Sequence, residues 1–157
     1  MHNLNWLELA AKVRVENRET MVSWWCDQTL AVWLRDGGRC VFCDENLMAR
    51  RELAYYYSSI DHLLPKAEDK YPQFQNMFWN QVLCCRSCNG IKRDTDPSKG
   101  ALAESVLTNP EYQPDNALVE QWIKTVWEAI ELRRSQLNER FDRESSLIND
   151  ALSNLTR

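Results

Sequence analysis

Apolar positions in the first part of the chain recur at the three- and four-residue spacing of an amphipathic helix. Residues 5–36 follow this pattern, and Asn5 is a suitable N-cap for its first turn. A break is expected near residues 17–20, and Gly37–Gly38 provides a C-terminal stop. The pattern therefore predicts an N-terminal helical part that ends just before residue 40.

The pattern changes over residues 40–93, where the apolar runs become short. Tyr55–Tyr57 together with Ile60 predicts one strand, and Val82–Leu83 predicts another. Two short strands in an otherwise helical chain indicate a small mixed centre.

Helical signals return after residue 95. Asp96–Pro97 and Asn109–Pro110 each have the pattern of an N-cap followed by proline at the first helical position. Asp115 is expected to cap a long helix whose apolar stripe comprises Leu118, Trp122, Val126, Ile130, Leu137 and Phe141. Arg133 and Arg140 interrupt this stripe, so a long coiled coil is weakly supported. A last apolar stripe comprises Leu147, Ile148, Ala151, Leu152 and Leu155.

Six of the seven tryptophans lie in the flanking helical parts: Trp6, Trp24, Trp25, Trp33, Trp122 and Trp127. Tryptophans at helical spacing usually build a core, here one between the N- and C-terminal helices. The alternative is a protein interface, where tryptophan is enriched.

The composition is that of an ordered globular chain, with 157 residues, 44% hydrophobic and 27% charged. This length favours one compact domain with an arm. No apolar run is long enough to span a bilayer, and no signal-peptide core follows Met1. We therefore expect a soluble, cytoplasmic protein with no membrane partner.

The formal net charge is −4, which by itself argues against nucleic-acid binding. The charge is unevenly distributed, however. Residues 101–157 contain six basic and ten acidic residues, whereas residues 84–100 carry a net +2 from Arg86, Lys92, Arg93 and Lys99. The sequence thus predicts a basic site with an acidic arm that is unlikely to face phosphates.

Two matched cysteine pairs, Cys40-x2-Cys43 and Cys85-x2-Cys88, have the spacing of zinc knuckles. Four thiolates leave no open coordination position, so the ion would be a structural Zn²⁺. The alternatives are a redox dithiol, simple buried cysteines, or a Cys84-x3-Cys88 pair. We prefer Cys85 because its spacing repeats that of the first knuckle, which makes Cys84 a small core residue, as Cys26 would be in its helix.

The insert between the knuckles contains groups suited to phosphodiester hydrolysis. His62 can take a proton from water, because an imidazole titrates near neutral pH. Asp61 and Asn89 offer two oxygen ligands for one hard divalent ion. Arg86, Lys92 and Arg93 are expected to meet backbone phosphates; the alternative is an ordinary solvated surface.

The stretches "RDGGRCVFC", "IDHLLPK" and "NQVLCCRSCNGIKRD" make residues 35–95 resemble the HNH endonuclease family of the zinc-knuckle type. The resemblance implies a mainly α fold with a small ββα-metal core, in which N- and C-terminal helices wrap a four-cysteine frame. It also implies that the catalytic ion bridges the scissile phosphate and the leaving 3′ oxygen, and that Asn80 orients the base through the backbone. DNA is the substrate it favours. Many members carry a histidine where this chain has Asn89, and an amide oxygen there favours Mg²⁺ or Mn²⁺.

These observations divide the chain into N-terminal helices (1–36), a nuclease core with its zinc site (37–100) and a C-terminal helical arm (101–157). The expected function is a metal-dependent endonuclease. One alternative is a zinc-organised binding module that has lost catalysis, whose sign would be a missing catalytic residue. Another is an effector subunit that is active only with a partner. The end of the arm is expected to mediate self-association or docking of a protein partner.

Overall fold

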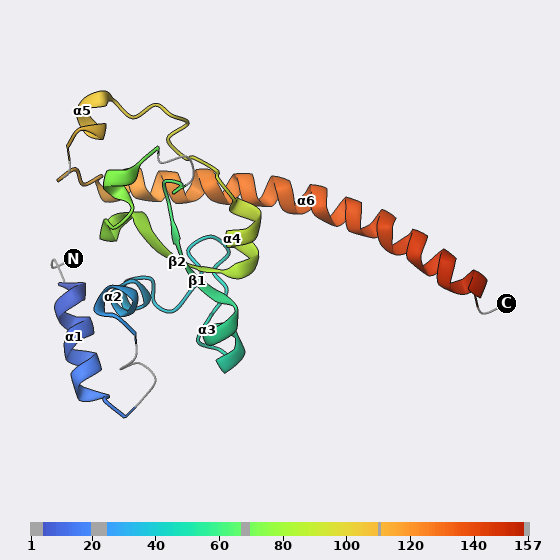
Figure 1. Cartoon of the computed structure of the whole chain (residues 1–157), viewed down its shortest axis with the longest axis horizontal. Helices are drawn as coiled ribbons and strands as arrows, with labels where there is room; N and C mark the ends of the chain where they lie inside the picture. Colours follow the sequence, from blue (N-terminus) through green and yellow to red (C-terminus); the bar gives the residue numbers. More distant parts are fainter. Residues whose placement is uncertain (1–4, 20–24, 67–69, 110, 156–157) are drawn as a thin grey trace.

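The computed structural model describes residues 5–19, 25–66, 70–109 and 111–155. Trp24 and Pro110, which the sequence analysis assigned to a core and a helix start, lie outside these residues. The elements are α1 (Trp6–Glu16), α2 (Asp27–Arg35), α3 (Arg51–Tyr56), β1 (Ser58–His62), β2 (Gln81–Cys85), α4 (Arg86–Lys92), α5 (Glu104–Leu107) and α6 (Asn116–Leu155), with 3-10 turns at Pro72–Phe74 and Phe78–Asn80. In Figure 1 the small sheet lies between the α1–α2 pair and the long helix α6.

The sheet consists of β1 and β2, which pair antiparallel with Ser58 opposite Cys85 and His62 opposite Gln81. Helix α4 follows β2 directly, so the centre is a ββα unit in a mostly helical chain. This confirms the predicted fold class. Val82, Leu83 and Cys84 are all buried, which means that both faces of β2 are covered.

One predicted strand is displaced. Tyr55 and Tyr56 belong to the short helix α3, and β1 begins only at Ser58. All three tyrosines of the run are exposed, so they form no buried strand face. The Ser58 hydroxyl donates to the Ala54 carbonyl and thereby closes the turn that leads from the helix into the strand.

The N-terminal helices begin and end largely where the pattern predicts. Asn5 Oδ1 accepts from the Glu8 amide, and α1 ends at Glu16. Helix α2 ends before Gly37 and Gly38, which both have positive φ values (62° and 68°) that glycine adopts readily. Cys26, expected in the core, is exposed instead and caps α2 by accepting from the Thr29 amide.

Helix α2 is joined to β2 by a pair of charged residues at its C-terminal end. Arg35 donates to the Phe78 carbonyl (2.8 Å) and to the Gln81 carbonyl (2.5 Å). Asp36 Oδ2 accepts from the Leu83 amide (2.8 Å), and Arg35 and Asp36 also pair with each other. These bonds satisfy backbone groups of the sheet edge and fix the start of the first cysteine knuckle against it.

Tryptophans contribute to two hydrophobic clusters rather than to one. Trp33 and Trp122 are buried in the main cluster, but Trp122 packs on Trp79 (ring centroids 6.1 Å apart), which comes from between the knuckles. Trp6 packs in the second cluster, between α1 and α2. The N- and C-terminal helices therefore cover the central unit from two sides instead of packing mainly on each other.

Two predicted helix starts after α4 are turns. Asp96 Oδ1 accepts from the Ser98 amide and hydroxyl, and Asn109 Oδ1 accepts from the Glu111 amide, but no helix follows either residue directly. Asp115, in contrast, caps α6 as expected, because its Oδ1 accepts from the Leu118 amide (2.7 Å).

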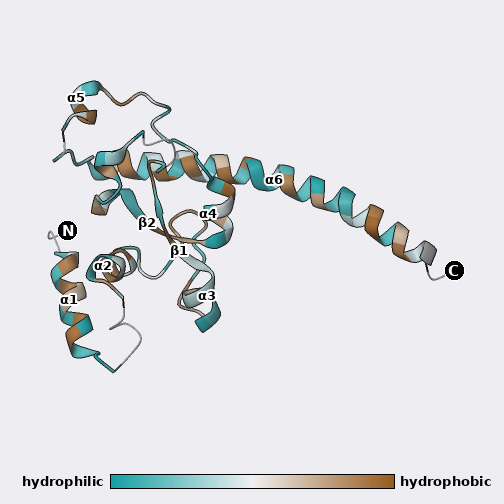
Figure 2. Ribbon diagram, viewed as in Figure 1, coloured by the Kyte–Doolittle hydropathy of each residue, from teal (hydrophilic) through white to brown (hydrophobic). Residues whose placement is uncertain are grey.

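Helix α6 packs on the centre only through its first half. Trp122, Val126 and Ile130 are buried, and Arg133 donates to the Ile91 and Lys92 carbonyls at the end of α4. Beyond that point α6 extends away from the other elements, although apolar positions continue along it (Figures 1 and 2). Among the described residues, no helix combines the length and apolar composition that crossing a membrane requires.

Candidate metal centre and candidate active site

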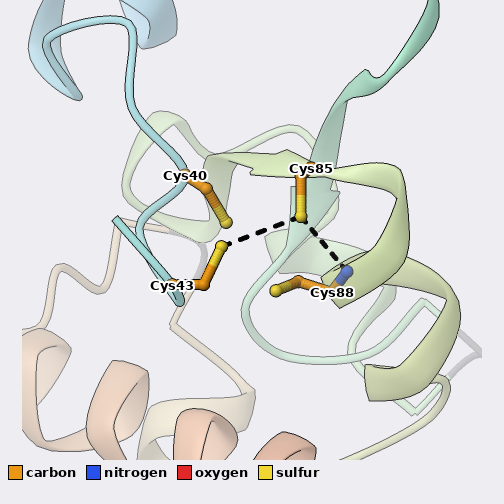
Figure 3. A group of neighbouring side chains, drawn as sticks. All are labelled: Cys40, Cys43, Cys85 and Cys88. Atoms are coloured by element: carbon orange, nitrogen blue, oxygen red, sulfur yellow. Dashed lines mark hydrogen bonds between the residues drawn. The ribbon is translucent and has the colours of Figure 1, made fainter. Parts of the chain in front are cut away.

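The four knuckle cysteines converge on one point (Figure 3). Cys40 and Cys43 come from the turn after α2, while Cys85 ends β2 and Cys88 lies in α4. Their Sγ atoms lie within 4.8 Å of one another, and the Cys43–Cys85 pair is 3.8 Å apart. Thiolates about 2.3 Å from a tetrahedral zinc ion are about 3.8 Å apart. This cysteine cluster could therefore hold a metal ion such as zinc.

The pKa values of the cluster cysteines are shifted in opposite directions. Hydrogen bonds from the Cys85 and Cys88 thiols lower the pKa of Cys40 far below its usual value of 9.0. Burial raises the pKa of Cys43 to about 11. Arg134 of α6 donates a hydrogen bond to Cys88 Sγ (3.4 Å) and so places a positive charge beside the cluster.

Cys84 lies outside the cluster. Its thiol is buried and lies 3.6 Å from the Ser59 carbonyl oxygen, and burial raises its pKa. Because neighbouring strand residues face opposite ways, Cys85 reaches the cluster while Cys84 faces the core. The geometry therefore supports the Cys85-x2-Cys88 knuckle over the Cys84-x3-Cys88 alternative.

Asp61 lies on β1 and faces α4. Its Oδ2 atom is buried and forms no hydrogen bond within the described residues. The Lys92 ammonium lies 3.3 Å from this oxygen as an ion-pair partner, and the Lys92 side chain is only 1% exposed. A buried carboxylate oxygen with one cation beside it and no hydrogen bond is suited to coordinating a metal ion.

Asn89 lies one turn before Lys92 on the same side of α4. Its amide nitrogen donates to the Ser59 hydroxyl (3.0 Å), which leaves the amide oxygen as the end that can bind a cation. Ser59 and Asp61 are two residues apart on β1 and share a strand face. The structure thus places both Asp61 and Asn89 where β1 meets α4. Asp61 is held there by Lys92, and Asn89 by Ser59.

His62 is half-buried at the end of β1, and its Nε2 lies 2.9 Å from the Gln75 carbonyl oxygen. Because a carbonyl only accepts, Nε2 carries the proton and Nδ1 carries the lone pair in the neutral ring. Burial lowers the pKa of His62 below its usual 6.5, against the opposing effects of the Gln75 carbonyl and Asp61. The ring is therefore neutral at pH 7, and Nδ1 can accept a proton.

Asn80 is 1% exposed and joins the residues that follow His62 to the turn that precedes Gln75. Its Oδ1 accepts from the Leu64 amide (2.7 Å), and its Nδ2 donates to the Phe74 carbonyl (3.0 Å). Its own carbonyl accepts from the Leu63 amide (2.7 Å). Since Gln75 follows Phe74, Asn80 holds both the strand end that carries His62 and the carbonyl that orients its ring.

The three residues expected to contact phosphates are not equivalent. Arg86, the first residue of α4, and Arg93, its C-cap residue, are exposed. Lys92 is buried against Asp61 and is not part of their surface. The physical reason is the helical phase: Lys92 lies three residues after Asn89, on the side that faces β1.

Sequence reasoning missed three partners: the Gln75 carbonyl, the Ser59 hydroxyl and the Arg134 guanidinium. The Gln75 carbonyl leaves no trace in a sequence, because every residue has one. Ser59 could have been found from residue spacing. Residues two apart on a strand share a face, as Ser59 and Asp61 do, and residues three apart on a helix share a side, as Asn89 and Lys92 do. The two pairs can therefore meet across a strand–helix contact, Ser59 with Asn89 and Asp61 with Lys92.

A family model described as HNH endonuclease matches residues 40–98. The match begins at Cys40 and includes both strands, α4 and every site residue that the sequence predicted. The central segment of the chain is thus similar to the HNH endonuclease family, which supports a nuclease-type function in general. No curated protein and no solved structure gives a significant match to the chain.

Proposed function

We propose that the protein is a metal-dependent HNH endonuclease that hydrolyses phosphodiester bonds in DNA, with His62 as general base. The observation that carries this proposal is the pair of neighbours His62 and Asp61: a neutral imidazole whose Nδ1 carries the lone pair lies next in the chain to a buried carboxylate oxygen that has no hydrogen bond among the described residues. All four residues that the family resemblance implies, Asp61, His62, Asn80 and Asn89, are present. This favours an enzyme over a binding module that has lost catalysis.

In this proposal each residue has a separate role. His62 Nδ1 takes a proton from the attacking water, while the Gln75 carbonyl holds Nε2–H and fixes the tautomer. Asn80 is a positioning residue that acts through the backbone. Asp61 and Asn89 would hold one Mg²⁺ or Mn²⁺, because both offer oxygen donors. When bound there, such an ion would supply positive charge that stabilises the phosphate and the leaving 3′ oxygen.

The cysteine cluster would hold a structural Zn²⁺ on Cys40, Cys43, Cys85 and Cys88. An all-thiolate tetrahedral site has no open position for a substrate, so this ion would organise the fold and take no part in hydrolysis. Its position at the strand–helix junction couples the metal to the orientation of α4, and hence to Asn89.

We also propose that the exposed end of α6 binds a second copy of the chain or a protein partner. Phe141, Leu147 and Ile148 are each at least 60% exposed there. This supports the second candidate function, an effector subunit that needs a partner. Comparing cleavage by the isolated chain with cleavage after adding proteins encoded nearby separates the two.

The nuclease proposal is tested by incubating pure protein with plasmid, single-stranded DNA or RNA. Each substrate is tried with Mg²⁺, with Mn²⁺ and with EDTA, and zinc content is measured after EDTA treatment so that loss of structural metal is recognised. We expect DNA cleavage that requires the added ion in protein that keeps its zinc. Zinc-loaded protein that cleaves none of the three substrates would contradict an autonomous nuclease, and cleavage of RNA alone would contradict the DNA assignment.

A further inference from the structure

A groove of about 310 Å³ lies between α4 and the middle of α6. Three arginines line it, Arg93 at the C-cap of α4 and Arg133 and Arg140 from α6, together with Gly90, Gln136 and Leu137. Among the described residues, no carboxylate lines the groove. The lining is therefore strongly basic, although the net charge of the chain is −4.

Local charge explains how an acidic arm forms a basic groove. Residues 133–143 contain four arginines and only two carboxylates, whereas residues 101–132 contain six carboxylates and a single lysine. The acidic part of α6 thus precedes the groove. The net charge of the arm as a whole therefore does not describe this stretch.

Arg133 is held by neutral groups, and Arg140 by an exposed ion pair. Arg133 donates to the Ile91 and Lys92 carbonyls and to the Thr95 hydroxyl (2.7 Å), all of which are neutral acceptors. Arg140 pairs with Glu144 (2.7 Å), and both side chains are more than half exposed. An exposed ion pair contributes little free energy, so a phosphate can compete for Arg140.

The groove adjoins the candidate active site through α4. Gly90 lies one turn after Arg86 on α4, and Arg93 is the C-cap residue of that helix. Gly90 directly follows Asn89, a proposed ligand of the catalytic ion. A Cβ added at Gly90 would meet nothing within 4 Å, so bare backbone borders open space at this point.

We propose that this α4–α6 groove binds the phosphate backbone of the nucleic-acid substrate beside the scissile bond. The inference rests on the proposed nuclease function and extends the substrate site from α4 onto the arm. Guanidinium groups suit this role because they donate several hydrogen bonds to phosphate oxygens.

The test measures binding of a labelled DNA duplex without added divalent ion, with each variant made in a His62→Ala background. Arg140→Gln is compared with Arg143→Gln, which removes the same charge from α6 but does not line the groove. We expect Arg140→Gln to weaken binding about fivefold and to reduce the slope of log K against log salt by about 0.9, the effect of one lost phosphate contact. Arg143→Gln should change the affinity less than twofold.

A second pair of variants separates an effect on binding from an effect on folding. Gly90→Glu and Gly90→Gln add side chains of equal size into open space, and both residues favour a helix more than glycine does. The carboxylate should weaken binding by at least tenfold more than the amide. Equal effects within each pair would overturn the groove, whether or not the wild type cleaves DNA. Groove-dependent binding by a wild type that does not cleave would instead support the groove and contradict the nuclease.

Discussion

At the scale of single residues, the Lys92–Asp61 pair links the candidate active site to the stability of the fold. Both groups lie between β1 and α4, and Lys92 is almost fully buried. A divalent ion on Asp61 would take over part of the charge compensation that Lys92 now provides. Stability and ion binding at this junction should therefore be coupled.

We predict that Lys92→Met destabilises the protein by about 3–5 kcal/mol, because it leaves a buried carboxylate without its cation. Mg²⁺ should restore part of this loss, since the ion neutralises the same carboxylate. Urea unfolding with and without Mg²⁺ measures both effects, and the exposed Arg93→Met is the control. A loss that Mg²⁺ does not reduce would argue against Asp61 as a ligand.

The cysteines provide a second prediction at this scale. Cys85→Ser should lose the bound zinc and unfold the central segment, because structural zinc contributes about 10 kcal/mol or more of apparent binding free energy. Cys84→Ser should keep the zinc, since its sulfur lies outside the cluster. Elemental analysis and circular dichroism of the two variants provide the comparison, and the reverse pattern would show that the wrong cysteine was chosen.

At this scale the sequence predicts chemistry better than orientation. The four cysteines are recognisable because two matched pairs share one spacing, and Asp61 and His62 because they are adjacent. The burial of Lys92 could not be predicted, since the phase of a seven-residue helix is weakly determined by its few apolar positions. Its lysine looks the same in a sequence whether it faces solvent or a carboxylate.

At the scale of elements, the same side-chain chemistry can start a helix or close a turn. Asp96, expected as a helix cap, instead accepts hydrogen bonds from Lys70, Tyr71 and Ser98. Short polar side chains bond nearby backbone in both settings, so local sequence does not separate them. The run Tyr55–Tyr57 shows that strand prediction is limited in the same way. Aromatic residues favour strands when they pack on a half-buried surface, but these three tyrosines are exposed.

The Asp96 cluster makes stability depend on pH. Burial acts to raise the pKa of Asp96, but the hydrogen bonds from Lys70, Ser98 and Tyr71 outweigh it and lower the pKa from 3.8 to about 2. The stabilisation is fully present above pH 3.8 and is lost as the pH falls towards 2. Asp96→Asn should cost about 1–2 kcal/mol at pH 7, allowing for partial exposure, and less at pH 2–3. Unfolding at both pH values measures this, and a pH-independent loss would contradict it.

At the scale of the whole molecule, the two halves of α6 differ in what they contact. Its first half fixes the end of α4 through Arg133, whereas its last turns extend beyond the other elements (Figure 1). The apolar stripe predicted this long helix and its cap at Asp115. It did not predict where packing ends, because that depends on how far the small centre reaches along the helix.

Deleting residues 142–157 should therefore change the free energy of unfolding by less than about 1 kcal/mol, since the described side chains removed are almost all exposed. The same deletion should abolish self-association, measured as mass by light scattering. Arg140 remains in the truncated chain, so DNA binding should persist. A wild type that is monomeric at every concentration, with a truncation that binds the same proteins, would contradict an association role.

The central claim is that His62 acts as the general base of a nuclease, and its most direct test is the single-turnover cleavage rate of His62→Ala. The account predicts a fall of about 10²–10⁴ from wild type. Zinc content, unfolding free energy and DNA affinity should stay nearly unchanged, because the ring is only half-buried and, within the described residues, bonds only to the Gln75 carbonyl. A His62→Ala variant that cleaves DNA at the wild-type rate would contradict the account.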